Sequence, residues 1–165
     1  MNLCDRDTIR ALLERHGFRF SKSLGQNFLT DPQIPADIAA ASGADENCGV
    51  LEIGPGIGPL TAELARRAGK VVSVELDRTL LPVLAETMAP FPNVEIVQGD
   101  VLRLDLGALA VEKFRGLTPI VCANLPYNIT SPALQKFVET SCFRSVTVLI
   151  QKEVAQRLSA PQGSP

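Results

Sequence analysis

The chain has 165 residues, of which 45% are hydrophobic and 21% are charged, and its net charge is −2. This length and composition predict one globular domain and exclude an intrinsically disordered chain. The near-neutral charge also argues against a protein that binds nucleic acid through an overall basic surface, although a local basic patch stays compatible with it.

Two features predict where the protein works. No apolar run approaches the roughly 20 residues that span a bilayer, and charges between Met1 and Phe20 interrupt the apolar core that a signal peptide needs. The four cysteines lack paired C-x-x-C spacing and His16 is the one histidine, so we expect reduced thiols and no metal site. We therefore expect a cytoplasmic protein without membrane attachment, in which Cys122 is a core residue.

The chain is predicted to begin with two helices. The first should end near His16, where the side chain can interact with the helix dipole. The second should begin with Asp31 as its cap and Pro32 at its first position. Its buried side is predicted to consist of Ile34, Ile38 and Ala41.

Five apolar runs rich in valine and isoleucine then alternate with helical stripes, which predicts an α/β fold with a parallel sheet covered on both faces. The predicted strands are Val50–Ile53, Val71–Glu75, Val94–Val97, Ile120–Ala123 and Val146–Ile150. The predicted stripes are Leu60, Leu64 and Ala68; Leu80, Leu81, Leu84 and Met88; and, after the start signal Ser131-Pro132, Leu134, Phe137 and Val138. With a last helix over 151–158, residues 1–158 should form one domain and residues 159–165 a short tail.

The first predicted strand runs directly into a glycine-rich turn that contains Gly54 and Gly56 and opens a helix. Glycine tolerates positive φ and has no side chain, so such a turn can present backbone N–H groups to an anionic group. A dinucleotide-binding fingerprint would need a glycine at Pro59. The pattern E-x-G-x-G-x-G from Glu52 instead resembles adenosylmethionine sites; a purely structural tight turn is the alternative.

Carboxylates follow the next two predicted strands. Glu75 comes 21 positions after Gly54, where it can accept hydrogen bonds from both ribose hydroxyls of a nucleoside, whereas its neighbour Asp77 fits a helix cap. Asp100 follows the third strand, within reach of an adenine amino group, although an isolated aspartate in a loop is often a turn former. Because ligands of open parallel sheets bind at the carboxyl ends of the strands, these residues predict a nucleoside site.

The segment Asn124–Tyr127 follows the fourth predicted strand and matches the Asn-x-Pro-aromatic motif of amino methyltransferases. The Asn124 side-chain oxygen and the Leu125 carbonyl can accept the two hydrogens of an exocyclic amine, which directs the nitrogen lone pair at a methyl donor. Pro126 would fix the turn, and Tyr127 could stack on an unpaired base. A turn with only a structural role is the alternative.

Together these motifs resemble the ribosomal RNA adenine dimethyltransferase family, and more narrowly its KsgA type. The matching segments are Ser23–Asp31, the glycine turn, Glu75, Gly99-Asp100, Asn124–Pro132 and Gln151–Ala155. The resemblance implies a class I Rossmann-like methyltransferase fold that uses S-adenosyl-L-methionine. It also implies transfer of two methyl groups to N6 of each of two adjacent adenosines near the 3′ end of small-subunit (16S) ribosomal RNA.

The resemblance also implies roles for individual residues. Asn27 and Leu29 would contact the methionine end of the cofactor, and Gly54 and Gly56 would form the glycine turn beside it. Glu75 would contact the ribose and Asp100 the adenine. Asn124 would contact both the cofactor and the target amine. The implied partner is small-subunit ribosomal RNA in an immature 30S subunit, and a monomer is favoured. Phe28 could approach the target base or anchor its loop, and Lys152 and Arg157 could contact phosphates or form a solvated helix face.

The chain departs from the family at its end, because full members continue past Pro165 with the last strands of the sheet and a small helical domain. We therefore expect a catalytic domain that is incomplete at its C-terminal end. Two alternatives stay open: an enzyme of the macrolide-resistance type that methylates large-subunit RNA, and a noncatalytic RNA-binding assembly factor. Leu125 and Asn128–Pro132 favour the small-subunit type, while Asn124 and Tyr127 argue against a noncatalytic factor.

Overall fold

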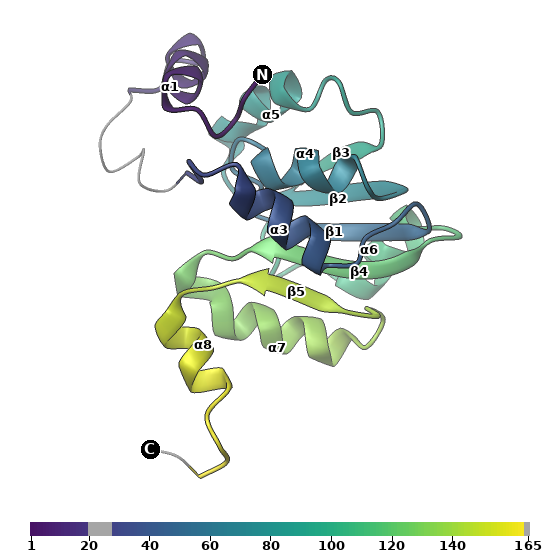
Figure 1. Ribbon diagram of the computed structural model, residues 1–165. Helices are drawn as coiled ribbons and strands as arrows, with labels where there is room; N and C mark the ends of the chain where they lie inside the picture. The colour runs from purple at the N-terminus through teal and green to yellow at the C-terminus, as the bar shows by residue number, and fades with distance from the viewer. Residues whose placement is uncertain (20–27, 164–165) are drawn as a thin grey trace.

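The computed structural model describes residues 1–19 and 28–163 and shows a five-stranded sheet between helices (Figure 1). The strand order is β3-β2-β1-β4-β5, and every neighbouring pair is parallel. The strands are β1 (Cys48–Ile53), β2 (Lys70–Glu75), β3 (Val94–Gln98), β4 (Thr118–Asn124) and β5 (Val146–Leu149). The predicted parallel α/β fold is confirmed, and each predicted strand end lies within two residues of the observed one.

Seven α-helices and two short 3₁₀ helices connect or flank the strands in the described part of the chain. They are α1 (Arg6–Arg15), α3 (Gln33–Ala41), α4 (Pro59–Ala65), η1 (Arg78–Leu80), α5 (Leu81–Thr87), α6 (Leu106–Lys113), η2 (Tyr127–Ile129), α7 (Thr130–Thr140) and α8 (Lys152–Leu158). Among these helices, none combines the length and apolar character that a bilayer crossing requires.

Two layers of apolar side chains hold the helices to the sheet. Successive residues of a strand point to opposite faces, so Val50 packs with α3 and α4 while Leu51 packs with α6 and α7. A strand that is buried on both faces reads as a continuous apolar run, which is why β1 and β4 were recognisable in the sequence. A third cluster joins α1 to α4 and α5, and therefore fixes the first helix near the end of β1.

The predicted start of α3 and the predicted buried faces of α3 and α7 are wrong. α3 begins one residue later than predicted, at Gln33, with Pro32 as its cap, while the Asp31 carboxylate accepts a hydrogen bond from the Gln33 N–H at 2.9 Å. Its buried side consists of Pro35, Ile38 and Ala39, so the predicted Ile34 and Ala41 are exposed. On α7 the buried residues are Thr130, Ala133 and Phe137, and the predicted Val138 is 73% exposed. Each helix buries residues that are spaced three and four positions apart. The pattern of apolar side chains alone did not predict how each helix is rotated about its own axis.

Candidate functional site

The glycine turn lies at the carboxyl end of β1, in the centre of the sheet. Gly54, Gly56 and Gly58 have φ values of 66°, 61° and 104°, a region that side chains other than glycine rarely occupy. The Gly54 N–H donates to the Val74 carbonyl on β2 at 2.9 Å, and Pro59 stands at the first turn of α4. The predicted strand–turn–helix unit is therefore present, with positive φ at each turn glycine.

An inner cavity of about 250 Å³ opens beside this turn. Its lining includes side chains from α1 and from the segment before α3, together with the turn itself; site residues among them are Leu29, Glu52, Gly54, Gly56, Asp77 and Asn124. The structure thus brings Leu29, the two glycines and Asn124 together at one cavity. The predicted Asn27 lies outside the described residues.

Glu75 lies at the end of β2, next to the inner cavity rather than on its wall. Its carboxylate accepts a hydrogen bond from the Asp77 N–H at 3.1 Å, and Asp77 also accepts from the Thr79 N–H as the cap of η1, which confirms the predicted cap. Burial raises the pKa of the Glu75 carboxyl, while the backbone N–H groups of Asp77 and Gly56 lower it. Glu75 is therefore attached to the glycine turn through Gly56, and to the loop after β2.

Asp100 follows β3 and belongs to the same edge of the sheet. The Gly99 N–H donates to the Glu75 carbonyl at 2.9 Å, and the Asp100 carboxylate accepts from the Leu102 N–H at 3.0 Å. Two leucines that sequence reasoning missed stand beside these carboxylates: Leu76 is 64% exposed and Leu102 is 37% exposed. Both leucines therefore leave apolar side chains in solvent at the ends of two neighbouring strands.

The turn after β4 borders a second, outer hollow of about 550 Å³. One wall is formed by Asn124–Asn128 and another by the neighbouring residues 149–151 at the end of β5, and Gly54 also lines the hollow. Pro126 has φ −57°, and its carbonyl accepts from the Thr130 hydroxyl at 3.1 Å, so the turn is fixed from both ends. Leu125 is buried, whereas Tyr127 is 72% exposed, free to stack on an incoming ring.

Asn124 and Gly54 line both the inner cavity and the outer hollow. The two turns also lie close together, since a Cβ placed on Gly54 would lie 3.8 Å from the Pro126 ring. A ligand in the inner cavity and a ligand in the outer hollow would therefore meet at the Asn124 side chain.

A buried carboxyl group under the glycine turn was not predicted as a site residue. The Glu52 Oε2 atom accepts hydrogen bonds from the Thr61 and Ser73 hydroxyls, each at 2.6 Å, and Glu52 is one of the residues lining the inner cavity. Burial raises the pKa of Glu52 to about 7, against the lowering effect of the two hydroxyl hydrogen bonds and with a further rise from the charge of Glu75. The E-x-G-x-G-x-G pattern begins at this residue and was the signal that could have identified it.

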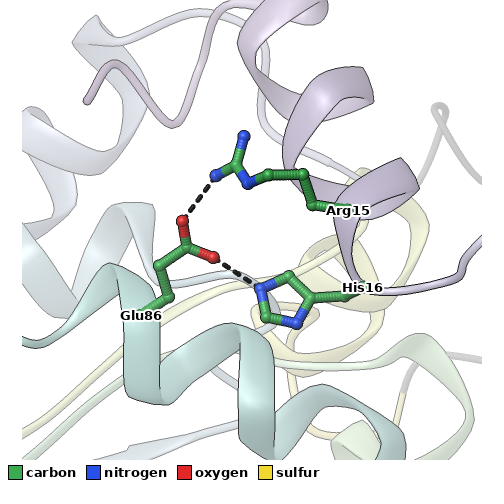
Figure 2. A network of polar contacts seen from close by, with 3 residues as sticks. All are labelled: Arg15, His16 and Glu86. Carbon is green, nitrogen blue, oxygen red and sulfur yellow. Dashed lines mark hydrogen bonds and ion pairs between the residues drawn. The ribbon is translucent and has the colours of Figure 1, made fainter.

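The first helix supplies the remaining wall of the inner cavity through Leu13, and Phe18 follows it. Figure 2 shows how the end of α1 is attached: Arg15 and His16 both contact the Glu86 carboxylate on α5, each at 2.5 Å. These hydrogen bonds lower the pKa of Glu86. His16 is the C-terminal cap of α1, as predicted, and it has a carboxylate partner that the sequence did not indicate.

Cys122 and two basic residues of α8 were also singled out in the sequence. Cys122 is fully buried, as predicted for a core residue, and burial raises its pKa to about 12. Lys152 and Arg157 are exposed on α8, the helix that begins directly after Gln151. In the described part of the chain, no group of three or more His, Cys, Asp or Glu side chains could hold a metal ion.

Comparison with known proteins places these features in a family. Residues 17–165 match the family model of ribosomal RNA adenine dimethylase. Ribosomal RNA small subunit methyltransferase A from Shouchella clausii is 53% identical over 156 residues, which are 93% of this chain and 53% of that protein. The chain thus spans about half the length of the curated relatives it matches.

Solved structures show the same fold. The 23S ribosomal RNA methyltransferase ErmE superposes with a TM-score of 0.68 and 34% identity, over 79% of this chain and 50% of that one. A dimethyladenosine transferase from Plasmodium falciparum superposes with a TM-score of 0.66 and 28% identity, over 81% of this chain and 46% of that one. The architecture is that of class I adenosylmethionine-dependent methyltransferases, as the sequence predicted.

Proposed function

This chain belongs to the ribosomal RNA adenine dimethylase family, and on that basis we propose that it binds S-adenosyl-L-methionine and dimethylates N6 of two adjacent adenosines near the 3′ end of small-subunit ribosomal RNA. The observation that supports this function best is the position of Asn124, which borders both the inner cavity and the outer hollow. Such a residue can hold a target amine against a methyl donor.

The inner cavity and the sheet edge beside it fit the cofactor. Backbone at Gly54 and Gly56 would approach the methionine end, with Leu29 and Asn27 beside it, and the Glu75 carboxylate would accept hydrogen bonds from the ribose hydroxyls. The exposed Leu76 and Leu102 would flank the adenine ring, with Asp100 accepting from its amino group. When bound, the cofactor supplies an electrophilic methyl group on a positively charged sulfur.

The outer hollow fits an unpaired adenine. The Asn124 oxygen and the Leu125 carbonyl would accept hydrogen bonds from the exocyclic amine, which makes its lone pair more available and points it along the line of attack. Tyr127 would stack on the flipped base, and Pro126 keeps these groups in one geometry. Rate enhancement would come from alignment and electrostatics rather than from covalent catalysis or a strong base.

We further propose that the partner is small-subunit ribosomal RNA in an immature 30S subunit, contacted by a monomer in the cytoplasm, with Lys152 and Arg157 near phosphates. A large-subunit target of the macrolide-resistance type is the second candidate, because ErmE shares the fold. The small-subunit assignment is preferred because the curated relatives of that type are more similar, at 53% against 34% identity. The noncatalytic alternative does not explain why Asn124 and Tyr127 face an open hollow.

The proposed function is tested in two steps. Calorimetric titration with S-adenosyl-L-methionine should show saturable binding that Glu75→Ala weakens about ten- to a hundredfold, since charge-assisted hydrogen bonds are lost. The matched control is Glu112→Ala, which removes an exposed glutamate of α6. In a transfer assay on immature small subunits, Asn124→Ala should lose far more activity than RNA affinity. Absence of cofactor binding by the folded chain, or equal losses of activity and RNA affinity for Asn124→Ala, would overturn the assignment.

A further inference from the structure

A second wall of the outer hollow, beside the Asn124 turn, is formed by the end of β5. Asn124 is the register partner of Leu149, and the Leu125 N–H donates to the Leu149 carbonyl at 3.2 Å. Gln151 follows two residues later, between β5 and α8, and β5 lies beside β4 in Figure 1. Gln151 therefore lines the same hollow as the groups assigned to the target amine.

Gln151 has a polar side chain whose hydrogen-bonding capacity is unused within the fold. Its exposed side chain does not cap α8, and in residues 1–19 and 28–163 it forms no hydrogen bond. The two other residues of this wall, Leu149 and Ile150, have apolar side chains. Any side-chain hydrogen bond that a ligand makes with this wall must therefore come from the Gln151 amide.

The chemistry of adenine determines whether the oxygen or the nitrogen of the Gln151 amide can hydrogen-bond to the base. If the Asn124 oxygen and the Leu125 carbonyl take the amine hydrogens, the groups left on the ring edges are the acceptor nitrogens N1, N3 and N7. An acceptor needs a donor, and the Gln151 Nε2 amide group supplies one without adding charge. A contact to a ring nitrogen also stays the same for the first and second methyl transfers, whereas the amine loses a hydrogen at the first.

We propose that Gln151 binds the target base, donating a hydrogen bond from Nε2 to one of the two ring nitrogens, N1 or N7, that flank the exocyclic amine. This rests on the proposed function and extends it: one wall of the hollow holds the amine, and the other recognises the ring. A purine in a different orientation would leave the amide of Gln151 without its acceptor.

The test compares base analogues with variants. Gln151→Glu keeps the shape of the side chain but removes its donor, and Gln151→Met removes both polar groups at similar length. Gln156→Glu adds the same charge elsewhere on α8 and is the matched control. The substrates are small subunits reconstituted with RNA that carries adenosine, 1-deazaadenosine or 7-deazaadenosine at the target positions, and kcat/KM is measured for each.

On adenosine, Gln151→Glu and Gln151→Met should each lower kcat/KM about tenfold, which is the usual effect of losing one such hydrogen bond, while Gln156→Glu changes it little. On the deaza analogue that lacks the contacted nitrogen, the unsubstituted chain and both Gln151 variants should have equal kcat/KM, and this identifies N1 or N7 as the acceptor. Affinity for S-adenosyl-L-methionine, measured by calorimetry, should be unchanged.

Two outcomes overturn the proposal. One is a loss of activity in the Gln151 variants that is the same for adenosine and for both deaza analogues, because a base contact must disappear with its acceptor. The other is full activity of Gln151→Met on adenosine. If the unsubstituted chain binds cofactor but transfers no methyl group to adenosine, the proposed function itself fails, and the role of Gln151 falls with it.

Discussion

Replacing Glu52 by glutamine should remove a pH dependence of stability that the buried carboxyl group gives to the fold. The folded-state pKa of about 7 lies above the ordinary value of 4.5, so folding favours the protonated form. The contribution of Glu52 to the free energy of unfolding is fully present below about pH 4.5 and is lost as the pH rises toward 7. The difference between the two pKa values corresponds to about 3 kcal/mol.

Glutamine is neutral at every pH and can still accept hydrogen bonds from Thr61 and Ser73 through its amide oxygen. Between about pH 4 and about pH 8, the free energy of unfolding of the unsubstituted chain should therefore fall by about 3 kcal/mol more than that of Glu52→Gln. Urea unfolding at a series of pH values measures this difference. Glu46→Gln, on the exposed loop before β1, is the control and should follow the unsubstituted chain. Parallel pH curves for Glu52→Gln and the unsubstituted chain would refute the reasoning.

Three further results are expected. Gly49→Ala should lower the free energy of unfolding by about 1–3 kcal/mol, because the added Cβ would overlap the Phe114 ring; unchanged stability in urea would contradict this packing. Glu86→Ala should weaken the affinity for S-adenosyl-L-methionine, measured by calorimetry, by about twofold to fivefold. The reason is that this change removes the exposed ion pair that holds the end of α1 beside the inner cavity. An unchanged affinity would show that the attachment of α1 does not affect cofactor binding. With a thiol reagent, Cys142 should react first and the buried Cys122, whose pKa is raised to about 12, only on unfolding, which mass spectrometry of labelled peptides can follow.

The sheet was predictable because its strands are buried on both faces and so appear as short apolar runs of β-branched residues. The rotation of the outer helices was harder to predict. α3 buries Pro35 and exposes Ile34, although isoleucine is the more apolar of the two. A helix at the surface has more than one possible apolar stripe, and the choice depends on what the neighbouring elements offer for packing.

The site was predictable where its residues follow strands, since the carboxyl ends of parallel strands meet at one edge. Glu75 and Asn124 could be placed on that basis. The role of Glu52 could not, because it depends on Ser73, which is 21 residues away and reaches Glu52 only across the pairing of β1 with β2. Gln151 was recognised only as part of a matching segment, because its place beside the Asn124 turn follows from the register of β4 with β5.

Strand order explains why both halves of the site meet at Asn124. β1 and β4 are neighbours, yet the helix after β1 packs on one face of the sheet and the helix after β4 on the other, which opens a crevice between the two turns. Gly54 and the Pro126 ring lie close together at that crevice. Donor and acceptor of the methyl group would therefore be aligned by the pairing of two central strands. A side chain introduced at Gly54 would strain the turn at its positive φ, so it should impair cofactor binding and methyl transfer together, whereas a change at Tyr127 should affect only the target side.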